Sequence, residues 1–427
     1  MVGEPPATVT GGPPARAPGE EVGGPHTAAG EFRLRSVAVS AYGPTVLEAM
    51  GYGAAIPIVP LLARELGASV GQAALVGALL GVGQVTTSLP AGALISRVGE
   101  RRAMVAASAV GAAVALLGAW SPHLIVLAAA TLITGMTWSV FLLARQGFMI
   151  DAVPSHLRAR ALSSLGGSHR VGMFLGPLLA VPLISTFGPR VAFIFSAVMS
   201  ILALGLVLQV EDLGVDERRA GLADPASVRA VLWGHRHTLA TLGLGVTAIN
   251  GLRALRMSIV PLWGDHVGLS AAQISLIFAV SSIVEIGLFY PAGAVMDRLG
   301  RAWLAVPTAA LLGLGLVLLP LTHDFGQVLA VTVLMAVGNG LGSGIVMTLG
   351  ADTAPRIHRA KYLGGWRLLG DIGMSGGPLT ASGLIALIGL APAIVAVGAA
   401  GMLASGWIGW WVAALDRSRR VNERMPG

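Results

Sequence analysis

The chain has 427 residues, of which 54% are hydrophobic and only 11% are charged, and its mean hydropathy is +0.76. A soluble domain carries about 25% charged residues, so this composition excludes an ordinary water-soluble enzyme. The chain contains no cysteine, which excludes disulfides, thiolate metal sites and cysteine nucleophiles. Its net charge of +7 comes almost entirely from arginine, because Lys361 is the only lysine.

Residues 1–37 are polar and rich in proline and glycine. They lack the apolar stretch of a secretory signal, so the first apolar segment is expected to remain as an uncleaved anchor. We expect residues 1–37 to form a disordered tail in the cytoplasm.

Twelve apolar segments follow, each about 20 residues or longer, the length that an α-helix needs to cross a bilayer. They are too rich in glycine and alanine for barrel strands, and such small residues let helix backbones approach closely. The segments cover residues 38–63, 72–95, 103–121, 123–146, 161–186, 190–209, 238–262, 272–294, 303–321, 326–349, 362–388 and 391–414.

Positive charge is concentrated in the loops on one side of these segments. The loops on the other side hold only Arg64 and Arg190. Because cytoplasmic loops carry an excess of arginine and lysine, the first set of loops and both termini are expected in the cytoplasm. The cytoplasmic set comprises Arg97, Arg101, Arg102, Arg158, Arg160, Arg298, Arg301, Arg356, Arg359 and Lys361.

A polar segment at 211–237 divides the chain into two halves. We expect six-helix bundles at 38–210 and 238–414, a cytoplasmic linker between them, and a cytoplasmic tail at 415–427. The halves repeat one another with an offset of 201 residues, as from Pro90 to Pro291 and from Gly172 to Gly373. The predicted fold class is therefore an all-α membrane protein with twelve transmembrane helices in two pseudo-symmetric bundles. Such duplicated bundles are typical of secondary transporters, whose binding site lies near the bilayer midplane.

A loop motif identifies a family with this architecture. The second half carries the pattern Gly-x-x-x-Asp-Arg-x-Gly-Arg, and the first half has Ser96 and Glu100 at the Asp and final Arg positions. On this motif, residues 38–414 resemble twelve-helix transporters of the major facilitator superfamily. The resemblance implies a charged gating latch on the cytoplasmic side. Its residues would be Gly92, Arg97, Gly99, Gly293, Asp297, Arg298, Gly300 and Arg301.

A second motif indicates a subgroup of that family. Gly172, Gly176 and Pro177 are similar to the antiporter-associated motif of the fifth helix, although its trailing glycine pair is missing. Thr131 stands where many drug antiporters carry an arginine. On the glycine and proline motif, and despite the absence of that arginine, the chain is most similar to proton-coupled drug and small-molecule exporters.

A charge at the bilayer centre costs about 2.5–3.5 kcal/mol, so charged residues there need a partner or a water-filled path. The proton-coupling candidates are Glu48, Glu285, Asp371, Arg170 and Arg367. By resemblance, helices 5 and 8 face each other, as do helices 2 and 11. We therefore expect an ion pair between Glu285 and Arg170, and Asp371 opposite Gln84 with Arg367 one turn away. Such pairs either couple protons to motion or only hold the halves together.

Helices 1, 4, 7 and 10 of the family line the cavity. Glu48 is expected to pair with Arg253, to face a cationic substrate, or to be satisfied by a hydroxyl such as that of Thr45. Arg256 is expected close to the outer interface. The candidates for contact with substrate, any of which could instead serve packing, are Trp138, Asn250, Arg253 and Asn339.

These features predict a monomeric, multi-pass transporter in the cell membrane, most plausibly the bacterial inner membrane. It would export a lipophilic or amphipathic small molecule in exchange for protons, with membrane lipid around it. The alternatives are proton symport of a metabolite and a lipid-handling protein or membrane enzyme on the same fold. No cofactor, metal site or nucleic-acid partner is expected, and no nucleotide-binding Gly-x-x-x-x-Gly-Lys-Ser/Thr motif occurs.

Overall fold

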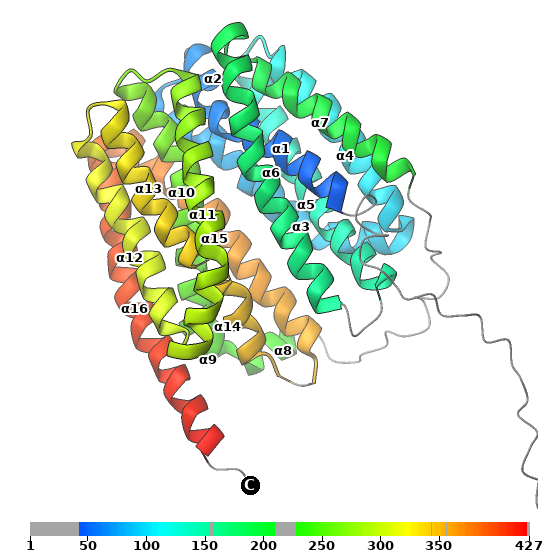
Figure 1. The fold of residues 1–427 in the computed structure, drawn as a ribbon, viewed down its shortest axis with the longest axis vertical. Coiled ribbons are helices and arrows are strands. Elements are labelled where there is room, and N and C mark those ends of the chain that lie inside the picture. The colour runs from blue at the N-terminus through cyan, green and yellow to red at the C-terminus, as the bar shows by residue number, and fades with distance from the viewer. Residues whose placement is uncertain (1–41, 154–157, 210–227, 343, 356, 425–427) are drawn as a thin grey trace, which may run out of the picture. The chain divides into compact units, whose positions relative to one another are not determined.

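The computed structural model describes residues 42–424 except 154–157, 210–227, 343 and 356. The described residues belong to one of two compact units, Leu34–Gly427, and the other unit, Met1–Arg33, lies outside them. The expected tail at 1–37 and most of the expected linker therefore fall outside the description. Within the described ranges the secondary structure is helical, with no strand (Figure 1).

The first half begins with a broken helix. The 3-10 turn Ile56–Ile58 separates two helical pieces, because Pro57 and Pro60 lack the backbone N–H that a continuous helix needs. The helices of this half are α1 Gly43–Ala55, α2 Val59–Glu65, α3 Val70–Val98, α4 Glu100–Ala119, α5 Leu124–Ala152, α6 Arg158–Phe187 and α7 Val191–Leu208.

The second half follows the same order after two short helices, α8 Val228–Gly234 and α9 Arg236–Thr238. Its tenth membrane segment is split into two helices on either side of Gly342 and Gly344. The long helices are α10 Leu244–His266, α11 Ala271–Leu299, α12 Ala302–Leu318, α13 Phe325–Leu341, α14 Ile345–Thr353, α15 Arg359–Ile388 and α16 Leu390–Arg424.

Among the described residues, eleven helical segments are long and apolar enough to cross a membrane. The remaining expected span lies in α15, which has 30 residues but carries Lys361, Arg367 and Asp371. With α15 the chain has the expected sequence of spans, and it is an all-α, multi-pass membrane protein.

The end of the chain differs from expectation. Most of the expected tail at 415–427 is helical, because α16 continues to Arg424 and its last turns run past the neighbouring helices (Figure 1). Asp416 explains part of this order, because its Oδ2 accepts a hydrogen bond from the backbone N–H of Ala302 at 3.0 Å. The helix is thereby fastened to the start of α12.

The repeat is visible in local geometry. Ser69 with Gln72 and Ser270 with Gln273 form the same reciprocal capping box at the starts of α3 and α11. Glycines with positive φ, a conformation that strains other residues, recur at the same offset of 201 residues. The pairs are Gly67 with Gly268, Gly99 with Gly300, and Gly188 with Gly389.

The antiporter-like glycines bring two helices into close contact. A Cβ on Gly172 or Gly176 would lie 2.4 or 2.2 Å from the carbonyl oxygens of Val46 and Met50 in α1. Their counterpart Gly373 in α15 approaches α10 in the same way, with 2.1 Å from such a Cβ to the carbonyl oxygen of Thr247. In this chain the motif therefore sets the packing of α6 on α1 and, by repetition, of α15 on α10.

The two halves meet where the family resemblance places their contact. α3 packs on α15 and α6 packs on α11. Ser382 Oγ donates to the carbonyl oxygen of Gly71 at 2.9 Å, and Arg64 Nε lies 3.5 Å from Asp265 Oδ2. Both contacts lie at the helix ends predicted to face outward.

We expect Gly176→Ala to lower the melting temperature in detergent, because the added methyl group has no room and overpacking costs about 1–3 kcal/mol. The matched control is Gly166→Ala on the same helix, where no heavy atom lies within 4 Å of the added Cβ. Equal melting temperatures for the two variants would contradict the packing role of the motif.

Candidate functional site

A cavity of about 420 Å³ lies between the two halves, here called the central cavity. Its walls come from α1, α3, α5 and α6 of the first half and from α10, α11, α13 and α15 of the second. This volume lies within the range of small-molecule sites. Its polar and aromatic lining comprises Tyr52, Gln84, Trp138, His169, Arg170, Asn250, Arg253, Arg256, Glu285, Asn339 and Asp371.

Glu285 is held by two partners from its own half. Arg256 Nη2 of α10 forms an ion pair with Glu285 Oε1 at 2.5 Å, and Asn339 Nδ2 of α13 donates to Oε2 at 2.7 Å. Arg256 is only 2% exposed. The expected position of Arg256 near the outer interface is therefore wrong, because its guanidinium turns inward to the carboxylate. The expected partner, Arg170, also lines the cavity and interacts electrostatically with Glu285.

Asp371 lies at the contact between the halves, which we call the seam. Ser88 Oγ of α3 donates to Asp371 Oδ2 of α15 at 2.9 Å. The expected neighbour, Gln84, stands one turn before Ser88 and donates instead to the Tyr52 hydroxyl at 3.0 Å. Arg367 also crosses the seam, since its Nη1 donates to Gln146 Oε1 of α5 at 3.4 Å.

Arg253 lies in the cavity wall between neutral partners. Its Nη1 donates to Asn250 Oδ1 at 3.3 Å, and its Nη2 donates to the Gly342 carbonyl oxygen at 2.6 Å. Gly342 stands at the break between α13 and α14. The guanidinium thus reaches across from α10 to the broken helix.

Glu48 does not reach Arg253. It is 9% exposed and its Oε2 accepts a hydrogen bond from Ser200 Oγ of α7 at 3.0 Å. It lines a second, smaller chamber of about 40 Å³ inside the first half, together with Thr131, Thr134 and Ser196. Of the alternatives drawn from the sequence, the structure favours hydrogen bonding to a hydroxyl, that of Ser200, and it satisfies Oε2 but leaves Oε1 without a hydrogen bond among the described residues.

An aromatic wall separates this chamber from the central cavity. The rings of Tyr52 and Trp138 stack at 4.3 Å between centroids, and the His169 ring lies 5.5 Å from Trp138. Tyr52 and Trp138 line both spaces. Sequence reasoning selected Trp138 and missed Tyr52, although Tyr52 stands one turn after Glu48 and so shares its helix face.

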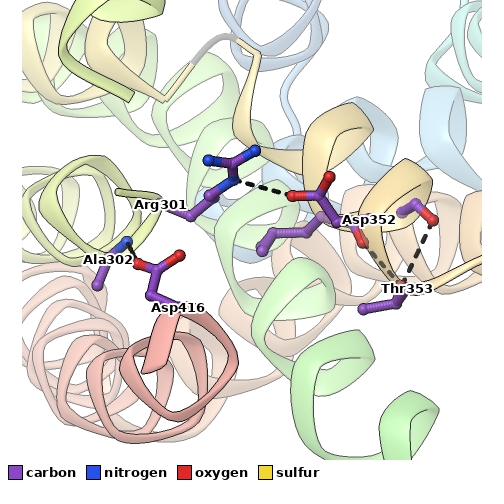
Figure 2. Close-up of polar contacts among 7 residues, drawn as sticks. Arg301, Ala302, Asp352, Thr353 and Asp416 are labelled. Carbon is purple, nitrogen blue, oxygen red and sulfur yellow. Dashed lines mark hydrogen bonds and ion pairs between the residues drawn. The ribbon is translucent and has the colours of Figure 1, made fainter. Parts of the chain in front are cut away.

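The latch residues of the second half form a bridge between helix ends. Arg301 Nε donates to Asp352 Oδ2 at 2.9 Å, which ties the start of α12 to α14 (Figure 2). Arg97 and Arg298 are exposed, and the side chain of Asp297 lies outside the description.

The first half has no equivalent arginine at this position. Glu100, which corresponds to Arg301, packs against Gly147 of α5, where an added Cβ would lie 3.1 Å from Glu100 Oε1. Gly92 and Gly293, the first glycines of the two latch motifs, have no close tertiary contact in the described part of the chain; Leu143 at 4.0 Å from an added Cβ on Gly92 is the nearest.

Within the described residues, no group of three histidine, aspartate or glutamate side chains is placed to hold a metal ion. The chemistry that the central cavity offers is therefore that of guanidinium, carboxyl and amide groups beside apolar and aromatic surface.

Comparison with known proteins identifies the family. The sequence profile of the Major Facilitator Superfamily matches residues 45–255 and 242–425. The chain belongs to this superfamily and is a transporter of its type. The tetracycline resistance protein of class C from Escherichia coli is 26% identical over 355 residues, which cover 81% of this chain and 88% of that protein.

Other similarities are of the same order. An uncharacterized MFS-type transporter of Mycobacterium tuberculosis is 26% identical over 377 residues, with 84% of this chain and 88% of that protein covered. Among solved structures, a POT family transporter in complex with 5-aminolevulinic acid matches with a TM-score of 0.74 at 11% identity. That match covers 89% of this chain and 96% of the other, and it shows that the two share a fold.

We expect Arg256→Gln to lower the melting temperature markedly, because it removes the guanidinium that forms a close ion pair with the Glu285 carboxylate. Breaking a buried ion pair costs about 3–5 kcal/mol, whereas replacing both charges costs less. The double variant Arg256→Gln/Glu285→Gln should therefore be more stable than the single one. The control is Arg64→Gln, since Arg64 is 37% exposed and surface pairs contribute little. A double variant no more stable than Arg256→Gln would contradict this pairing.

Proposed function

We propose that this protein exports an amphipathic small molecule in exchange for protons, by alternating access to the central cavity. The observation that carries the proposal is the position of Asp371. Its carboxyl lines the cavity and, at the same time, accepts its hydrogen bond from Ser88 of the other half.

A carboxyl at the seam is suited to coupling. When the halves rock against each other, Asp371 and Ser88 separate, and the surroundings of the carboxyl change. The proton affinity of a carboxyl depends on its hydrogen bonds, on nearby charges and on burial. A hydroxyl partner suits both states, because it donates to the carboxylate and accepts from the protonated acid. Motion and proton binding are then linked through one contact.

Glu285 takes a different role in this proposal. Its hydrogen-bonded partners Arg256 and Asn339 lie in the same half and move with it when the halves rock, whereas Arg170 of the other half interacts with it electrostatically. Its surroundings therefore change less than those of Asp371. We assign Glu285 to holding α10, α11 and α13 in place around the cavity, which is the static role considered for it above.

Export is favoured over uptake by the relatives. Two relatives of the chain are named tetracycline resistance proteins, of classes C and H. The class H protein is 32% identical over 168 residues, which cover 38% of this chain. The apolar stretches of the cavity wall, among them Ile56, Val59 and Met257, suit the apolar part of a substrate.

We further propose that the protein works as a monomer in the cell membrane, with both termini in the cytoplasm. Large apolar side chains such as Ile125, Leu387 and Leu403 are about 80% exposed, as expected for residues that face lipid.

The test is a transport assay with purified protein in liposomes that carry an imposed pH gradient and an internal pH dye. Tetracycline and a panel of other amphipathic compounds serve as substrates. Addition of a substrate should move protons in the direction opposite to the substrate. Accumulation of a compound in the same direction as protons would overturn export in favour of symport.

We expect Asp371→Asn to abolish proton movement, because an amide cannot take up and release the proton. The matched control is Asp265→Asn, which changes the other described acid that pairs across the seam, but at an exposed position. Proton coupling that survives in Asp371→Asn would remove Asp371 from the mechanism.

A further inference from the structure

The charges of the central cavity do not balance. Its wall holds three guanidinium groups, Arg170, Arg253 and Arg256, against two carboxyl groups, Glu285 and Asp371. Arg256 and Glu285 compensate each other at 2.5 Å. Asp371 is then the remaining acid of the lining against Arg170 and Arg253, so the wall carries a net positive charge.

Arg253 is a cation of this wall whose side-chain hydrogen bonds all go to uncharged groups. Both hydrogen bonds of its Nη atoms go to neutral oxygens, those of Asn250 and of the Gly342 backbone. Its Nε is buried and, among the described residues, has no hydrogen-bond partner. Neutral partners satisfy hydrogen-bond donors without cancelling the positive charge, so the guanidinium can still attract an anion in the cavity.

Positive charge continues outside the lining, toward the helix ends predicted to be cytoplasmic. Arg145 of α5 is 9% exposed, and its Nε and Nη1 have no partner within the described part of the chain. The adjacent residue, Gln146, accepts the hydrogen bond of Arg367 from across the seam. An anion that enters from this end is attracted along its whole path, whereas a cation is repelled.

The rest of the wall is apolar. Val59, Leu80, Met173, Met257 and Ile286 contribute aliphatic and thioether surface next to the arginines. Methionine adapts its shape to different partners, so this surface suits a hydrophobic group of variable outline. The stacked Tyr52 and Trp138 rings add a flat face.

We propose that the central cavity binds amphipathic organic anions, and that Arg253 contacts the anionic group while the apolar wall takes the hydrophobic part. A guanidinium presents paired N–H donors that match a carboxylate, sulfonate or phosphate. Both carboxyl groups of the cavity already have partners in the protein, so neither is available to pair with a cationic substrate. This inference rests on the proposed function only for the idea that the cavity receives the transported molecule.

The first experiment measures binding, without transport, to the detergent-solubilised full chain. The probes share one naphthalene ring system and differ in charge: dansyl-glycine is an anion, dansyl-glycinamide is neutral, and dansylcadaverine is a cation. We expect dansyl-glycine to bind about tenfold more tightly than the amide, the value of one charge-assisted hydrogen bond, and the cation to bind most weakly.

Two variants separate recognition from folding. Arg253→Gln should weaken the anion about tenfold and leave the affinity of the neutral amide unchanged, whereas a merely structural role would alter all three probes alike. Arg64→Gln removes a positive charge outside the cavity and should change none of them. The proposal is overturned if the cation or the amide binds as tightly as the anion, or if Arg253→Gln weakens all three probes equally.

A second measurement decides the case in which no probe binds. The chain has no cysteine, so the substitution Met257→Cys, one turn from Arg253, introduces the only thiol that can react. The anionic 2-sulfonatoethyl methanethiosulfonate should modify it about tenfold faster than the cationic trimethylammonium reagent, relative to an exposed His123→Cys control. Addition of Arg253→Gln should reduce this ratio. A ratio near one would overturn the proposal.

The outcome is independent of the transport assay. If the cationic probe binds most tightly and proton exchange is intact, the proposal of an anion site is wrong and the proposal of export is unaffected. If the anionic probe binds most tightly but no proton exchange is seen, the proposal of proton coupling is wrong and the proposal of an anion site is unaffected.

Discussion

The structure depends on one constraint: an ionised group within a bilayer must have a partner or face water. The chain meets it in three ways. Arg256 and Glu285 form an ion pair inside the second half. Asp371 accepts a hydrogen bond from a hydroxyl of the first half, and Arg253 donates hydrogen bonds to amide oxygens. Only the second of these links the halves, and only the third gives a charged group hydrogen-bond partners that are all neutral. Coupling and recognition are thus assigned to different residues of one cavity.

Glycine content is the second condition for this arrangement. The charged groups can face a common cavity because α6 lies against α1, and α15 against α10, with almost no space between backbones. Lipid gives helices no hydrophobic reason to associate, so close backbone contact has to supply the packing. The motif that resembles an antiporter signature therefore has a mechanical basis here, which holds whatever the transported molecule is.

The sequence predicted the fold well and the site in part. Apolar length, the arginine asymmetry and the repeat of 201 residues each depend on local composition, and they led to the helices and the family. They could not give the direction in which a side chain points around its helix, because small differences in helix rotation decide it. For this reason Arg256, which was not predicted as a partner, forms a close ion pair with Glu285, and Ser88 donates the hydrogen bond to Asp371.

The repeat has a further implication for how such a chain came to work. Ser88 corresponds to Phe289 in the second half, and Asp371 corresponds to Arg170 in the first. An ancestral assembly of two identical carboxyl-terminal halves would set the aspartate against a phenylalanine, and two identical amino-terminal halves would set an arginine against the serine. The contact between hydroxyl and carboxyl exists in neither symmetric assembly. The contact therefore requires two copies that differ in sequence, as the two halves of this single polypeptide do.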